Sequence, residues 1–143
     1  MNIEDWFSGF FEADGYFSYS TNRRKMSRFP VVGITQLNNH PARIASILIG
    51  GKTHYVIPKS KYSGRELMYA PRYKWEARDK QSLLNALWYF DQCPLIGPKA
   101  EDYVIWRKIV MRYVEHGWKD NIFWGLCDEL SDLKGDRKSA HYA

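Results

Sequence analysis

"GFFEADGYFSYS", residues 9–20, marks the point where an apolar helix gives way to a strand. Residues 4–13 predict a short helix with acids in its first turn, and Gly15 is expected to end it. Beyond Gly15, polar and apolar residues alternate as in a half-buried strand. In that strand Phe17 is expected to face one side, and Ser18 and Ser20 the other.

Two acids, Glu12 and Asp14, therefore fall at the C-terminal end of a helix, where the helix dipole disfavours negative charge. A divalent cation would compensate them, because Mg²⁺ is bound by one or two carboxylates together with phosphate oxygens and water. The alternative is that Asp14 simply begins a turn, as Asp-Gly pairs often do. A calcium-binding EF-hand loop is excluded, since its first and last ligand positions would fall on Phe10 and Thr21.

The rest of the chain predicts an α+β protein. Turn residues and period-two alternation indicate two strand pairs, and longer apolar periodicities indicate helices. The expected elements are strands at 16–24 and 29–36, a helix at 38–51, strands at 53–59 and 67–77, and helices at 79–92, 99–115 and 119–133. The order is thus αββαββα with additional C-terminal helices, in one domain spanning 1–143. Within it, the first helix covers 4–15, the sheet about 16–77 and the C-terminal helices about 79–133, while the tail 134–143 is expected to be mobile.

Positive charge is confined to one segment of the chain. Residues 16–76 carry 11 Lys and Arg against two acids, whereas residues 1–15 carry four acids and no base, and residues 77–143 carry ten of each. Such segregation indicates a polyanion-binding surface, and a twisted antiparallel ribbon fits the DNA major groove. The alternative is that the basic residues only solvate a sheet face. The candidate DNA-binding residues are Ser18, Ser20, Asn22, Arg24, Arg28, Lys59, Lys61, Arg72 and Lys74.

Other features narrow the class of protein. No apolar stretch reaches 18 residues, and the N-terminus lacks the pattern of a secretory signal, so neither a membrane span nor secretion is expected. Cys93 and Cys127 fit buried thiols in a reducing compartment better than a disulfide or zinc site. We therefore expect an intracellular protein.

Residues 7–15, "FSGFFEADG", resemble the LAGLIDADG signature of homing endonucleases, with Gly9, Ala13, Asp14 and Gly15 identical to it. The predicted element order is also the order of that family's fold. Further along, "CPLIGPKAEDYVIW", residues 93–106, is similar to the family segment that brings a basic residue towards the active site.

The resemblance implies roles for individual residues. Asp14 and the carbonyl of Ala13 would bind Mg²⁺ or Mn²⁺, Gln36 would position the attacking water, and Lys99 would lie near the scissile phosphate. The alternatives are that Gln36 is a polar residue at a strand edge and Lys99 a surface lysine at a helix start. Two copies of the helix would pack together through Gly9, Glu12 and Ala13.

One motif per chain then implies a homodimer that brings two copies of Asp14 together above the minor groove of a long pseudo-palindromic site. The leading hypothesis is a site-specific, metal-dependent double-strand DNA endonuclease. A non-cleaving relative, such as an intron RNA maturase or a DNA-binding regulator, is the runner-up, and a structural module docked on RNA is a third possibility. The expected compartment is the mitochondrion or chloroplast in a eukaryote, and the cytoplasm in an archaeon or bacterium.

Overall fold

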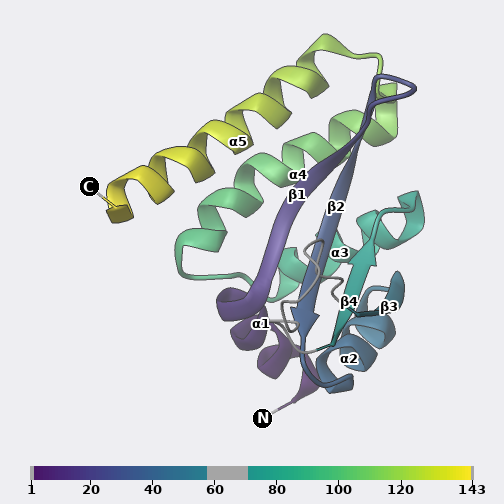
Figure 1. The fold of residues 1–143 in the computed structure, drawn as a ribbon, viewed down its shortest axis with the longest axis vertical. Helices are drawn as coiled ribbons and strands as arrows, with labels where there is room; N and C mark the ends of the chain where they lie inside the picture. Colours follow the sequence, from purple (N-terminus) through teal and green to yellow (C-terminus); the bar gives the residue numbers. More distant parts are fainter. Residues whose placement is uncertain (1, 58–70, 143) are drawn as a thin grey trace, which may run out of the picture.

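The computed structural model describes residues 2–57 and 71–142 and shows one sheet backed by helices (Figure 1). The predicted α+β fold, with four antiparallel strands and additional C-terminal helices, is confirmed. Its elements are α1 (Ile3–Asp14), β1 (Gly15–Asn22), β2 (Ser27–Gln36), α2 (His40–Leu48), β3 (Lys52–Val56), β4 (Arg72–Ala77), α3 (Lys80–Gln92), α4 (Pro98–His116) and α5 (Asn121–Tyr142). Among the described helices, none is long and apolar enough to span a membrane.

Local sequence explains where the helices begin. The side chain of Asn2 accepts a hydrogen bond from the Asp5 amide at the start of α1, at 2.8 Å. Asp79 caps α3 in the same way through the Ser82 amide, at 3.1 Å. Pro98 occupies the first position of α4, where its missing N–H costs nothing.

The strands are ordered β1-β2-β4-β3, and every neighbouring pair is antiparallel. The register pairs Phe17 with Val32 and Ile34 with Trp75, and all four side chains are buried on the face that the helices cover. Residues of the opposite parity lie on the other face, which no described helix covers and which we call the open face. Its members include Tyr16, Ser18, Ser20, Thr35, Lys52, His54, Arg72, Lys74 and Glu76.

An aromatic cluster joins α1 to the sheet and to the C-terminal helices. The Phe17 ring lies 4.9 Å from the rings of both Phe11 and Trp106, and 5.1 Å from that of Phe90. All four side chains are buried. Because α1 is held at its apolar face, its last residue has a fixed position at the start of β1.

Gly15 is required here for a different reason from the one that the sequence suggested. Its backbone is extended rather than left-handed, so it is not a left-handed helix cap. A Cβ at Gly15 would lie 2.2 Å from the Phe11 ring, which packs directly against the glycine. The glycine therefore allows α1 to pass into β1 without a loop.

The C-terminal tail does not match the expected mobile segment, because α5 continues to Tyr142. Arg137 forms an ion pair with the buried Asp102 of α4, with Nη2 and Oδ1 2.7 Å apart, and Lys134 donates a hydrogen bond to the Phe17 carbonyl. These contacts lie far apart in sequence, which explains why the local pattern did not reveal the longer helix. The expected loop 60–66 and parts of the third and fourth predicted strands lie outside the described residues.

Candidate active site and nucleic-acid interface

The end of α1 exposes a carboxylate beside an anchored lysine. Asp14 is the last residue of α1, is exposed, and has no hydrogen bond or ion pair within residues 2–57 and 71–142. Lys99, the second residue of α4, donates a hydrogen bond from Nζ to the Glu12 carbonyl at 2.7 Å. The fold therefore brings Lys99 to within two residues of Asp14 along α1, although the two are 85 positions apart in the chain.

Gln36 is the last residue of β2, two residues beyond the Ile34 that pairs with Gly15. Its own partner in the sheet is Tyr73 of β4. Its side chain has no hydrogen-bond partner in the described part of the chain. The structure thus brings Lys99 to the end of α1 that carries Ala13 and Asp14, with Gln36 at the end of the strand that pairs with the start of β1. The individual roles of these residues stay predictions.

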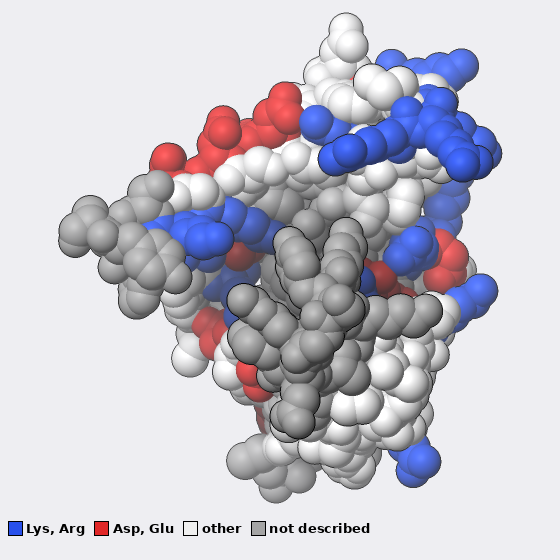
Figure 2. All heavy atoms as spheres, viewed as in Figure 1, with Lys and Arg blue, Asp and Glu red and all other residues white. Residues whose placement is uncertain are grey.

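The open face combines hydroxyl, amide and basic side chains from four strands. Figure 2 views this side of the molecule and shows Lys and Arg over the tip of the β1–β2 hairpin, where residues 23–25 are exposed. Acidic side chains gather instead along the outer edge of α5 (Figure 2). The charge segregation in the sequence is therefore also a segregation in space.

Among the described residues of this face, Glu76 is the acid, and it has several partners. It accepts a hydrogen bond from the Tyr16 hydroxyl at 2.9 Å and pairs with Arg78 at 2.7 Å, while Lys74 Nζ lies 3.9 Å away. Burial and the Glu76 carboxylate raise the pKa of Tyr16 above its ordinary value, so the hydroxyl stays a donor at neutral pH. The Glu76 carboxylate thus neutralises only part of the positive charge of the surrounding residues.

Most of the predicted DNA-contacting residues share this surface. Ser18, Ser20, Arg72 and Lys74 have the same parity across the register, as predicted. Asn22 shares their parity, and its side chain accepts hydrogen bonds from the amides of residues 24 and 25 in the hairpin turn. Lys59 and Lys61 lie outside the described residues.

Arg28 was assigned wrongly to this group. It follows the parity of Pro30 and Val32 and lies on the helix side of the sheet. Its guanidinium carbon is 4.0 Å from the centre of the Trp124 ring, and Nη1 pairs with Asp128 at 2.9 Å. The strand begins at Ser27, so the residue that looked like part of a basic turn is an inward-facing strand residue.

Sequence reasoning also missed basic residues that the register adds to the open face. Lys52 pairs with Glu76 and His54 with Lys74, which places both side chains with the predicted set. The alternation of Lys52, His54 and Val56 could have revealed them, because these residues share one face of a strand.

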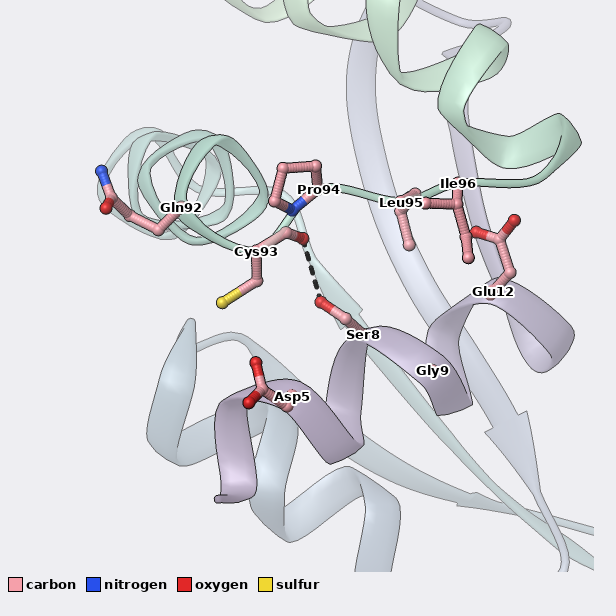
Figure 3. A pocket seen from close by; sticks show the side chains of 9 residues that line it. All are labelled: Asp5, Ser8, Gly9, Glu12, Gln92, Cys93, Pro94, Leu95 and Ile96. Carbon is pink, nitrogen blue, oxygen red and sulfur yellow. Dashed lines mark hydrogen bonds between the residues drawn. The ribbon is translucent and has the colours of Figure 1, made fainter. Parts of the chain in front are cut away.

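A second surface is formed by the exposed side of α1. A cavity of about 390 Å³ lies between this helix and the segment before α4 (Figure 3). The Ser8 hydroxyl donates to the Cys93 carbonyl at 3.0 Å and fixes the two walls together. The cavity is lined by Asp5, Ser8, Gly9, Glu12 and residues 92–96.

Three features of this surface have no explanation within the described part of one chain. A Cβ at the exposed Gly9 would meet no atom within 4 Å, so nothing in the described part of the chain requires a glycine there. Both carboxylate oxygens of Glu12 are buried and have no hydrogen-bond partner among the described residues. Next to them, Ile96 is 94% exposed. These features are those expected of a surface that another chain covers.

The donor set at the end of α1 is small. Within the described ranges there is no group of three or more His, Cys, Asp or Glu side chains that could hold a metal ion. Asp14 supplies one free carboxylate, and the last carbonyls of α1 lack intrahelical donors. One chain therefore provides part of a coordination sphere rather than a closed site.

Comparison with protein families and solved structures adds to this geometry. Residues 7–110 match the family described as LAGLIDADG endonuclease. No curated protein sequence matches the chain significantly.

Among solved structures, the archaeal intron-encoded homing endonuclease I-Vdi141I complexed with DNA aligns with a TM-score of 0.70 and 20% identity, over 91% of this chain and 82% of that one. The homing endonuclease I-TnaI aligns with a TM-score of 0.60 and 21% identity, over 95% and 96%. I-SmaMI bound to an uncleaved DNA target in the presence of calcium ions aligns with a TM-score of 0.62 and 17% identity, over 91% of this chain but only 43% of that one. At these identities the likeness establishes the shared fold.

Proposed function

This chain belongs to the LAGLIDADG endonuclease family, and we propose that it is a site-specific double-strand DNA endonuclease that acts as a homodimer with Mg²⁺ or Mn²⁺. One observation carries the proposal: an exposed, unpaired Asp14 lies at the end of α1 with Lys99 fixed beside it. The basic open face supplies a surface of suitable charge for the DNA. The DNA complex of I-Vdi141I, which shares the fold, is consistent with this use.

The residues at the end of α1 fit a hard divalent cation. Mg²⁺ is typically held by one or two carboxylates, with phosphate oxygens and waters completing an octahedron. Asp14 supplies the carboxylate, and the carbonyl of Ala13 can supply a second oxygen. When bound, the cation supplies charge neutralisation at the scissile phosphate.

The chain's own groups have distinct tasks in this proposal. Lys99 places a positive charge where negative charge develops on the phosphate, and its bond to the Glu12 carbonyl keeps the ammonium in place. Gln36, at the end of β2, can orient a water molecule through its amide group. Asp14 binds the cation and is not expected to exchange a proton.

The homodimer is supported by the exposed side of α1. A glycine inside a helix destabilises that helix by about 1 kcal/mol relative to alanine, and Gly9 has no packing role within its own described chain. Close approach of a second α1 gives it one, because the absence of a Cβ lets two helix backbones touch. Ala13, one turn further on and also exposed, extends this small-residue stripe. Pairing of two helices there brings two copies of Asp14 together, one for each DNA strand.

A cleavage selection tests the proposal directly. The native chain and Asp14→Asn are incubated with Mg²⁺ and a partly randomised palindromic DNA library, and the cut ends are sequenced. We expect the native chain to cut one pseudo-palindromic site and Asp14→Asn to bind that site without cutting it. Because Asp14 has no partner in the described chain, the variant should unfold at the native temperature.

The other outcomes separate the alternatives. A site that both proteins bind and neither cuts would replace the endonuclease with a regulator or maturase of the same fold. Cutting by Asp14→Asn at the native rate would remove Asp14 from the active site. If the selection recovers no bound DNA, the basic surface must bind a different polyanion.

A further inference from the structure

Two lysines from different helices bind backbone carbonyls that come shortly before and shortly after Asp14 in the sequence. Lys99 of α4 donates to the carbonyl of Glu12, two residues before Asp14, and Lys134 of α5 donates to the carbonyl of Phe17, three residues after it. Both side chains are half-buried. The C-terminal part of α5 thus reaches the first residues of β1, the strand that directly follows the end of α1 where Lys99 binds.

A buried ion pair fixes α5 in this position. The Arg137 guanidinium donates to both oxygens of Asp102, at 2.7 and 3.2 Å, and to the carbonyl of Pro98 at 3.2 Å. Asp102 is only 4% exposed. Because Pro98 directly precedes Lys99, this pair joins the end of α5 to the turn that carries the catalytic lysine. Figure 2 shows Lys and Arg gathered beside this end of α5, at the left of the view.

Lys134 itself is not neutralised. Within the described ranges it has no carboxylate partner within 4 Å, since Asp102 is engaged by Arg137, and its one hydrogen bond goes to an uncharged carbonyl. Burial lowers the pKa of Lys134 below its ordinary value; the neighbouring Asp102 opposes this shift, and the positive charges of Arg137 and Lys99 add to it. A half-buried, unpaired ammonium is unfavourable for folding. A bound anion would offset this cost, because an ammonium group has three hydrogen-bond donors and the Phe17 carbonyl uses one of them.

We propose that Lys134 binds a DNA phosphate beside Asp14, as a second cation of the cleavage site supplied by the C-terminal helix. The inference rests on the proposed endonuclease function for the identity of its anion. It makes residues 134–137 part of the active site: Lys134 contacts the phosphate, and Arg137 positions the helix that carries it.

The test compares Lys134→Met with Lys138→Met. Methionine keeps most of the length of the side chain and removes the charge, and Lys138 is an exposed lysine one turn further along the same helix. Three measurements are made on each protein: the melting temperature, the single-turnover cleavage rate with Mg²⁺, and DNA affinity as a function of salt without Mg²⁺. The DNA is a duplex carrying the selected site or, if no site is recovered, a mixed-sequence duplex of the same length.

We expect Lys134→Met to melt at or above the native temperature, to cleave at least tenfold more slowly, and to bind with a shallower salt dependence, as loss of a phosphate contact requires. Lys138→Met should match the native chain. Native cleavage and salt dependence in Lys134→Met would overturn the inference, and so would a lower melting temperature with native salt dependence, which would make Lys134 a purely structural residue. If the native chain itself does not cut, the proposed function fails, while the salt dependence still decides whether Lys134 contacts phosphate.

Discussion

Arg28 and Arg24 are close in sequence but lie in different surroundings. Arg28 lies between the rings of Tyr19 and Trp124, with its guanidinium carbon 4.8 and 4.0 Å from their centres, and pairs with Asp128. Arg24 is exposed in the hairpin turn. Because β2 begins at Ser27, Arg28 belongs to the strand and stabilises the fold, whereas Arg24 lies in the turn and is available to a ligand.

Arg28→Ala is expected to lower the free energy of unfolding by about 1–2 kcal/mol, because stacking of a guanidinium between two rings is lost. It should leave the salt dependence of DNA binding unchanged. Arg24→Ala should do the reverse, with native stability and a shallower salt dependence. Urea unfolding and fluorescence anisotropy on both variants check this pair, and a DNA-binding defect confined to Arg28→Ala would contradict the assignment.

At the residue scale, the face of the sheet on which a residue lies was predicted from parity alone, that is, from its odd or even position along the strand. Alternation placed Ser18, Ser20, Arg72 and Lys74 on one face, because successive strand residues point to opposite sides wherever the strand is regular. Parity gives no answer for a residue that is placed outside the strand, as with Arg28, because β2 begins at Ser27 and not at the predicted residue 29. It also cannot show which carbonyl a lysine reaches, so the anchoring of Lys99 needed the three-dimensional structure.

At the scale of elements, α1 contains a glycine, Gly9, that no described residue of its own chain requires. Gly9→Leu should abolish dimerisation, because two helix backbones could no longer touch. The folded monomer should tolerate the change, since no atom lies within 4 Å of the added Cβ and helix propensity rises by about 1 kcal/mol. Sedimentation over a range of concentrations measures the outcome.

Gly125 of α5 provides a matched control for Gly9. It is also an exposed glycine inside a helix, and its added Cβ would likewise meet nothing within 4 Å. Gly125→Leu should therefore show the same propensity gain and remain a dimer. If Gly9→Leu sediments like the native chain, α1 is not the dimer interface.

The helices and strands themselves were largely predictable because each carries its own signal. Asn2 and Asp79 begin helices, and the apolar period of 3.6 continues through α3 and α4. The end of α5 lacks such a signal, since residues 134–142 are mostly polar or charged. Among its described side chains, Arg137 and Lys134 hold it through contacts with α4 and β1. Long-range contacts therefore decide the segment that the inferred phosphate site uses, which is why sequence alone predicted a mobile tail.

At the scale of the whole molecule, the sheet separates two electrostatic environments. The open face carries Lys52, His54, Arg72 and Lys74 around the single described acid Glu76. The helix side carries balanced charges, many of them in pairs such as Arg112 with Asp120, at 2.6 Å. Most of the basic residues that contact DNA should therefore lie on the open face, and an exposed basic residue on the outer surface of the helices should contribute little to DNA binding.

Lys52 and Lys108 test this asymmetry, because both are exposed and only Lys52 lies on the open face. Each phosphate contact contributes about −0.9 to the slope of log affinity against log salt. A homodimer carries each substitution twice, so Lys52→Gln should reduce the magnitude of the slope by about two, whereas a monomer would lose about one. Lys108→Gln, on the outer surface of α4, should leave the slope unchanged. Anisotropy titrations from low to moderate salt measure both slopes. Equal effects of the two variants would refute a one-sided interface. A reduction of the slope by about one for Lys52→Gln would refute symmetric binding by two copies of the sheet.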